Sequence, residues 1–351
     1  MTDIQNYCAI ARRQGIKKVP VEFFLCPTLA SKFADYVKET GFEYKMASVM
    51  VPDAAAKCAS AETFAAYHPS NLKKGTFIDG YGVAHEPGSA AAFHMKKMHF
   101  PMADFDSVDQ VLEYPFPNYE NANDSAQIAA IKRAHDDDKV AVGRMECTVW
   151  ERSWYLRGME NLMVDMMTED PIADAILDRV TEISIKRAES YAKNGVDLIR
   201  LGDDIGMQHS IMMSEELYCA YIKPRLKRVI DAARAINPDI LIFYHSCGFV
   251  TPMIPHLIDA GINILDPIQP ECMNFKKIHD EFGNRLSFNG TIGTQSTMPF
   301  GSPDDVRREV FKNLDIAGSK GGLLVCPTHV LEPEVPVENL VAYIKACKEY
   351  I

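Results

Sequence analysis

The chain has 351 residues, 47% of them hydrophobic, so it can bury a large core as one barrel or as two ordinary domains. Its formal charge of −11 argues against a nucleic acid or an anionic membrane as partner. Nine scattered cysteines, with no signal-peptide pattern and no apolar run of membrane-spanning length, predict a protein of the reducing cytoplasm.

Short aliphatic runs typical of buried strands alternate along the chain with longer amphipathic segments typical of helices. The runs cover residues 18–25, 76–78, 140–144, 196–201, 240–244, 262–265, 285–288 and 323–325. Thr251-Pro252 and Ser302-Pro303 predict helix starts, and Gly195 and Gly261 stand where left-handed helix ends are expected.

Strand and helix repeated up to eight times predict a parallel sheet, and this length favours closure as a (β/α)8 TIM barrel. We expect residues 1–351 to form this single domain, with helical additions at the N-terminus. A doubly wound open sheet is the alternative, which is weakened because no Gly-x-Gly-x-x-Gly follows the first strand.

Polar side chains cluster at the predicted carboxyl ends of the strands, where barrel enzymes hold their catalytic residues. Any one of them could instead cap a helix or bond to a loop. They are Glu146, Cys147, Asp203, Asp204, His245, Cys247, Asp266, Gln269, Asn289, Cys326 and His329.

The strongest chemical signal is His245-Ser-Cys247, followed by a third soft ligand at Cys326. Residues i and i+2 of a strand project from the same face, so the imidazole and the thiol point the same way. With a thiolate from another strand they would make a three-ligand zinc site with one open position, as catalytic zinc requires. The competing interpretation is that both cysteines are simply buried, as free cysteines often are.

The stretch from Gly202 to the C-terminus resembles the uroporphyrinogen decarboxylase superfamily, and the N-terminal half resembles it more loosely. The motifs that carry the resemblance are His245-Ser-Cys-Gly248, Asp266-Pro-Ile-Gln-Pro-Glu271, Phe288-Asn-Gly-Thr-Ile-Gly-Thr-Gln295, Gly301-Ser-Pro-Asp-Asp-Val306, Gly321-Gly322, His329, Pro336-Val-Glu-Asn339, Asp79-Gly-Tyr-Gly82 and 101–108. The resemblance implies a (β/α)8 barrel with an active-site cleft at its C-terminal mouth.

Within this superfamily, the decarboxylases need cationic side chains for a substrate with many carboxylates. Here the corresponding region reads Val21-Glu-Phe-Phe-Leu-Cys-Pro-Thr28, without arginine. The His-x-Cys…Cys set instead resembles the zinc site of the corrinoid-dependent methyltransferases. That branch implies Zn2+ in the chain and a corrinoid (cobalamin) carried by a separate protein, because no Asp-x-His-x-x-Gly motif occurs here.

We therefore expect a zinc-dependent methyltransferase that moves a methyl group between a small methylated substrate and a partner's corrinoid. A methoxylated aromatic donor is favoured. Transfer from methylcobalamin to coenzyme M or another thiol, a uroporphyrinogen decarboxylase and a non-catalytic binding barrel are the alternatives, and homodimer formation is left open.

The remaining site residues are assigned by their positions at predicted strand ends or near them. Glu271 is the expected fourth zinc ligand, with Glu146 and Gln269 as alternatives, and Glu146 could instead pair with Arg152. The catalytic candidates are His329, Glu146 and Asp204; the substrate-binding candidates are Trp150, Tyr81 and Gln269.

Overall fold

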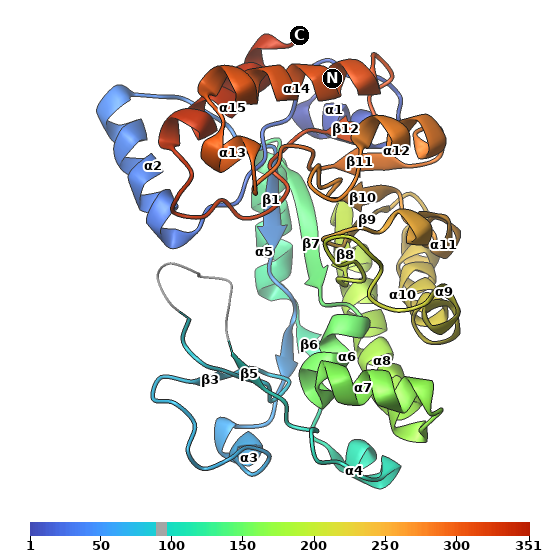
Figure 1. Ribbon diagram of the computed structural model, residues 1–351. Coiled ribbons are helices and arrows are strands. Elements are labelled where there is room, and N and C mark those ends of the chain that lie inside the picture. The colour runs from blue at the N-terminus through green and yellow to red at the C-terminus, as the bar shows by residue number, and fades with distance from the viewer. Residues whose placement is uncertain (89–96) are drawn as a thin grey trace.

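A curved parallel sheet forms the centre of the computed structural model, which describes residues 1–88 and 97–351 (Figure 1). Its strands lie in the order β1-β7-β8-β9-β10-β11-β12, and every neighbouring pair is parallel. They are β1 (Ser48–Val51), β7 (Val140–Glu146), β8 (Leu198–Gly202), β9 (Leu241–His245), β10 (Ile264–Asp266), β11 (Ser287–Asn289) and β12 (Leu323–Leu324).

The extended segment 19–25 lies between the start of β1 and the loop that follows β12, at the place of an eighth strand. On one side Ala47 N donates to Val21 O; on the other, Leu331 N donates to Phe24 O. Only Leu25 forms a strand-like bridge, with Leu331, so this predicted strand is present as an extended segment without a regular ladder. The (β/α)8 TIM-barrel prediction is confirmed.

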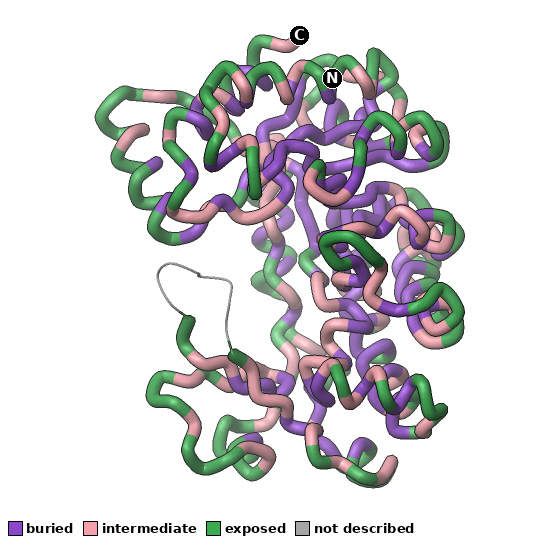
Figure 2. Tube along the Cα trace, in the orientation of Figure 1, coloured by how far each residue is buried: buried purple, intermediate pink, exposed green. Residues whose placement is uncertain are grey.

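Helices cover the outside of the sheet, and burial follows the strands while exposed residues lie on the outer helix faces (Figure 2). The helices of the barrel are α1 (Asp3–Ala11), α2 (Pro27–Thr40), α5 (Ser125–Asp136), α6 (Trp150–Arg157), α7 (Met159–Met167), α8 (Pro171–Asn194), α9 (Glu215–Leu217), α10 (Lys223–Ile236), α11 (Ile254–Ala260), α12 (Phe275–Phe282), α13 (Thr297–Phe300), α14 (Pro303–Ala317) and α15 (Val337–Glu349). A π-helical turn (Tyr218–Ile222) precedes α10, and a 3-10 turn (Thr251–Met253) precedes α11.

The predicted helix ends are largely confirmed. Ser302 caps α14 in a capping box with Asp305, and Gly195 and Gly261 end α8 and α11 with positive φ angles of 89° and 111°. Thr251 is not an N-cap, because the 3-10 turn already begins there, after Val250.

A small lobe is inserted between β1 and β7, at the lower left of Figure 1. It contains two antiparallel sheets and two helices: β2 (Ala55–Lys57) with β6 (Asn118–Asn123), β3 (Phe77–Ile78) with β4 (Ala84–His85) and β5 (Met98–His99), α3 (Ala61–Ala65) and α4 (Val108–Glu113). Residues 76–78 were therefore wrongly predicted to be a barrel strand, and β1 is the strand that fills that place. Throughout the described ranges, no helix is both long and apolar enough to cross a membrane.

Candidate metal centre

The carboxyl ends of β8, β9 and β10 bring a histidine, a cysteine and several carboxylates to one place. Asp203 and Asp204 follow β8, His245 ends β9 with Cys247 two residues later, and Asp266 ends β10. Because these three strands are parallel neighbours, their ends meet at the same edge of the sheet.

Three of these side chains converge on one point. His245 Nε2 lies 3.5 Å from Cys247 Sγ and 3.8 Å from Asp204 Oδ1, and the three ligand atoms lie within 4.8 Å of one another. Around a tetrahedral zinc ion, a histidine nitrogen and a thiolate sulfur are separated by about 3.6 Å. The donor set and its spacing therefore fit Zn2+.

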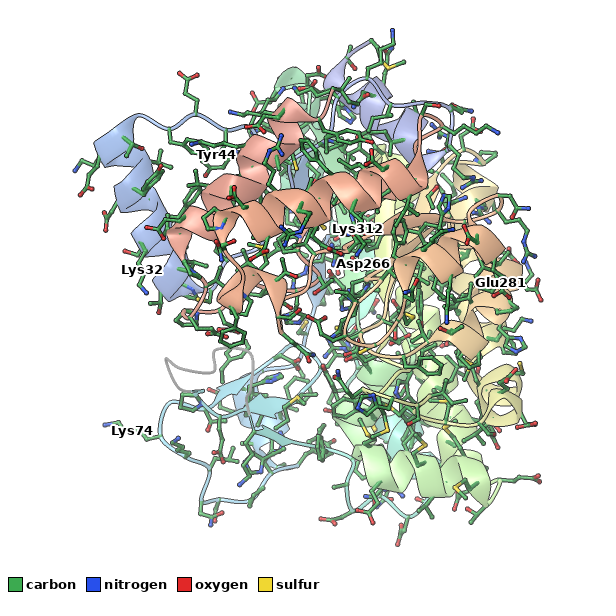
Figure 3. The ribbon with its side chains drawn as sticks, turned by 45° about the horizontal axis from the view of Figure 1, so that its top comes forward. Lys32, Tyr44, Lys74, Asp266, Glu281 and Lys312 are labelled. Carbon is green, nitrogen blue, oxygen red and sulfur yellow. The ribbon has the colours of Figure 1, made fainter. Side chains whose placement is uncertain are left out.

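A buried carboxylate fixes the orientation of the histidine ring. His245 Nδ1 donates to Asp266 Oδ2 at 2.6 Å, which directs Nε2 towards Cys247 and Asp204. Asp266 is 2% exposed and forms an ion pair with Arg200 Nη2 at 3.0 Å. In Figure 3, Asp266 lies towards the middle of the molecule, whereas Lys74 and Glu281 project at its outside. A partner of this kind is what a metal-binding histidine usually needs.

The ionisation of the two donors follows from this environment. Burial lowers the pKa of His245, but its hydrogen bonds to Asp266 and Cys247 act in the opposite direction and hold the net pKa well above the usual range. Burial raises the pKa of Cys247, while His245 lowers it. Metal binding at this group must therefore displace protons from both side chains.

Glu146 is held by two arginines of the barrel. Arg200 Nε lies 2.8 Å from one carboxylate oxygen and Arg144 Nε lies 3.0 Å from the other. The alternative pairing with Arg152 is wrong, because Arg152 forms its ion pair with Asp79 of the lobe at 3.1 Å. Glu146 thus reaches the histidine only through Arg200 and Asp266.

Cys326 and Glu271 lie outside the converging group. Cys326 Sγ donates to Asn289 Oδ1 at 3.1 Å, and burial raises the pKa of this thiol well above its usual range. Glu271 Oε1 accepts from Ser296 Oγ at 2.7 Å and from Gln295 N at 3.2 Å, so its carboxylate holds the loop after β11.

A cavity of about 380 Å³ opens beside Cys247. Gln269 and His329 both line it. Gln269 Oε1 also accepts from Gly248 N at 3.1 Å and so holds the loop that carries Cys247. The structure therefore places these two predicted residues where a substrate beside the metal donors would lie.

The two predicted aromatic contacts lie elsewhere. Trp150, the first residue of α6, is fully buried in the barrel core and does not line the cavity beside Cys247, so its contact with substrate stays a prediction. Tyr81 lies in the core of the lobe, where 8% of its surface is exposed. The guanidinium carbon of Arg152 lies over this ring, 4.2 Å from its centre. The two rings pack in different cores: Trp150 in the barrel core, and Tyr81 in a second apolar cluster that the lobe shares with α6 around Leu156.

Asp266 and Arg200 fix the orientation of His245, yet neither has an assigned role in the sequence-based prediction. Arg200 was detectable, because it is a charged residue within the aliphatic stretch Leu198–Leu201. A buried arginine requires acidic partners, and Asp266 and Glu146 supply them.

Curated relatives match roughly half of the chain. A methylated-thiol–coenzyme M methyltransferase of Methanosarcina mazei is 27% identical over 56% of this chain and 49% of its own length. A methylcobamide:CoM methyltransferase of Methanosarcina acetivorans is 24% identical over 53% and 52%, and a uroporphyrinogen decarboxylase of Citrifermentans bemidjiense is 24% identical over 50% and 49%. The chain thus spans about half the length of the curated relatives it matches.

The fold as a whole has a solved counterpart. A methyltransferase from Methanosarcina mazei superposes with a TM-score of 0.70, covering 100% of this chain and 99% of that one at 17% identity. Residues 89–350 match the family described as uroporphyrinogen decarboxylase (URO-D). The chain therefore belongs to the uroporphyrinogen decarboxylase family.

Proposed function

We propose that this chain is a zinc-dependent methyltransferase that moves a methyl group between a small methylated substrate and the corrinoid of a partner protein. The observation that carries the proposal is the convergence of His245, Cys247 and Asp204 beside a cavity at the barrel mouth. A plain decarboxylase has no need of a soft, oriented donor set of this kind.

His245 and Cys247 would hold the zinc, with Cys326 as the further soft ligand and Asp204 as the carboxylate nearest to it. When bound, zinc would act as the Lewis acid that favours an anionic sulfur or oxygen on the demethylated compound. Asp266 keeps His245 in the tautomer that presents Nε2, and Gln269 keeps the Cys247 loop in place. Gln269 and His329 are available to orient a substrate in the cavity.

For the substrate we retain an O-methyl donor of the methoxylated-aromatic class, with Co(I) of the corrinoid as acceptor. The burial of Trp150 removes one reason for that choice. Transfer to or from a small thiol is the second candidate, because two curated relatives carry names that specify coenzyme M methyltransferases. Uroporphyrinogen is disfavoured, since the described residues lining the cavity include Glu332 and Glu334 but neither arginine nor lysine.

The test is a methyl-transfer assay with zinc-loaded protein and free Co(I) corrinoid, offered methoxylated aromatics, methylated thiols or no donor. We expect donor-dependent formation of methyl-Co(III), seen by absorbance, and its loss in Cys247→Ser. If only methyl-Co(III) with a thiol reacts, the second candidate replaces the first. Undiminished turnover with all corrinoid excluded would contradict both.

A further inference from the structure

A second pairing of imidazole and thiol lies on the outer helix layer, away from the barrel mouth. Cys219 sits in the π-helical turn, and His256 belongs to α11, which packs beside α10 (Figure 1). Cys219 Sγ lies 3.4 Å from His256 Nδ1, and His256 Nε2 lies 3.0 Å from Glu215 Oε2 of α9. Cys219 Sγ also lies 3.9 Å from His256 Nε2, so the thiol rests beside the imidazole ring with Nδ1 as its nearer nitrogen.

Local backbone structure explains why the three side chains meet. Glu215 and Cys219 are four residues apart, which places them on one face of a helix, and His256 inserts between them from α11. The π-helical turn ends just before Pro224, which has no N–H to donate. Such a turn is rare and frequently accompanies a functional side chain.

The proton positions follow from the hydrogen bonds. Glu215 can only accept from His256, so the ring nitrogen Nε2 carries the hydrogen and the unprotonated Nδ1 is the nitrogen nearer to the thiol. A small rotation of these partly exposed side chains would bring the thiol onto Nδ1, where a histidine can remove the proton of a cysteine nucleophile. Cys219 is a free, partly exposed thiol, and Lys223, four residues further along the chain, forms an ion pair with Asp259 at 3.3 Å.

We propose that Cys219 is a modification site: an activated thiol that reacts with low-molecular-weight disulfides. In the step, His256 accepts the proton of Cys219 and the thiolate attacks one sulfur of the disulfide. A bond forms between Cys219 and that sulfur, the original S–S bond breaks, and the departing thiolate takes the proton from His256. No metal or corrinoid takes part, so the inference is independent of the proposed methyltransferase activity.

The experiment measures the reactivity of each cysteine in the full-length protein at pH 7 with 5,5′-dithiobis(2-nitrobenzoate) and with oxidised glutathione. Peptide mass mapping assigns each adduct. An ordinary thiol is only a few per cent thiolate at this pH, so proton removal by His256 should make Cys219 react about tenfold faster. Cys58, the residue after β2, is the internal reference, because it is exposed and, within residues 1–88 and 97–351, no imidazole bonds to it. Burial and the charge of Asp79 raise the pKa of Cys58, so its rate is a lower bound for an unassisted thiol.

Two variants separate activation from mere exposure. His256→Gln should slow the reaction of Cys219 about tenfold, and Glu215→Gln should slow it by a smaller factor, with Cys58 unchanged in both. Both positions are solvent-accessible, and thermal melting checks that each variant folds. A His256→Gln rate within twofold of the wild type, or wild-type Cys219 no faster than Cys58, would overturn the proposal. An unchanged Glu215→Gln rate would overturn the role given to Glu215.

Discussion

The barrel mouth and the outer helix layer each combine a histidine, a cysteine and a carboxylate, but in different geometries. At the mouth, Cys247 and Asp204 both approach the same nitrogen, Nε2 of His245. On the outer layer, Glu215 holds Nε2 of His256, and Cys219 lies beside the ring with Nδ1 as its nearer nitrogen. The first geometry presents three donor atoms to one point and can enclose a cation, whereas the second sets a thiol next to an unprotonated ring nitrogen that can take up its proton.

The support behind each histidine differs as well. Asp266, which orients His245, is almost fully buried and neutralised by Arg200. Glu215, which orients His256, has a side chain that is 49% exposed and has no second partner in the described ranges. A fixed ring suits a site that must hold a metal, while a surface pair suits a thiol that meets reagents from solvent.

The largest expected effect is on zinc affinity, and it distinguishes Cys247 from Cys219. Cys247→Ser should lower zinc affinity by several orders of magnitude because a soft thiolate ligand is lost. Cys219→Ser is the matched control and should bind zinc as the wild type does. The zinc content of each variant after dialysis against increasing concentrations of a chelator measures its affinity. Equal zinc retention by the two variants would show that zinc does not bind at the barrel mouth.

Zinc affinity should also rise steeply with pH, since zinc must displace protons. The pKa values of His245 and Cys247 are both raised, so below these values each group holds a proton that competes with the metal. Affinity should increase by about tenfold per pH unit for each proton released, between pH 6 and 8. Chelator competition gives the zinc affinity at each pH, and the pH change in weakly buffered solution gives the number of protons released. A pH-independent affinity would show that neither side chain binds zinc.

The strands that carry the metal centre were predictable because buried parallel strands leave a local signature of aliphatic residues. Residues 240–244 predicted β9 to within one residue, and His245 and Cys247 followed from the two-residue repeat of a strand. The lobe was not predictable in this way. Its strand β3 has only two residues, too few to reveal a period or to distinguish it from a barrel strand.

The identity of the carboxylate that faces His245 depended on contacts that no local pattern encodes. Asp203 and Asp204 are adjacent, yet Asp203 turns inward and accepts from Val149 N and Glu151 N at the start of α6. Asp204 is left facing His245. The way the start of α6 packs against the end of β8 decides which aspartate bonds to α6 and which faces His245. That packing belongs to the tertiary structure.

Removing the partner of the metal-site histidine should have an intermediate effect. Asp266→Asn keeps the shape but no longer stabilises His245 in one tautomer, and zinc affinity should fall about 10- to 100-fold. Glu215→Gln makes the same change at the outer histidine and should leave zinc affinity unaltered. Thermal melting of each variant separates loss of binding from loss of fold. Wild-type affinity in Asp266→Asn would show that His245 needs no carboxylate to bind zinc.

The smallest expected effect concerns the choice between Asp204 and Cys326. The Asp204 side chain is 39% exposed, so its charge is well solvated. Zinc together with the Cys247 thiolate carries a net charge of about +1, so a carboxylate about 4 Å away contributes about 1 kcal/mol in water-like surroundings, and Asp204→Asn should weaken zinc binding about fivefold. Cys326→Ser should weaken it much more if the thiolate is a direct ligand. The reverse order, with Asp204→Asn the more damaging, would make the carboxylate the third ligand and leave Cys326 as a buried partner of Asn289.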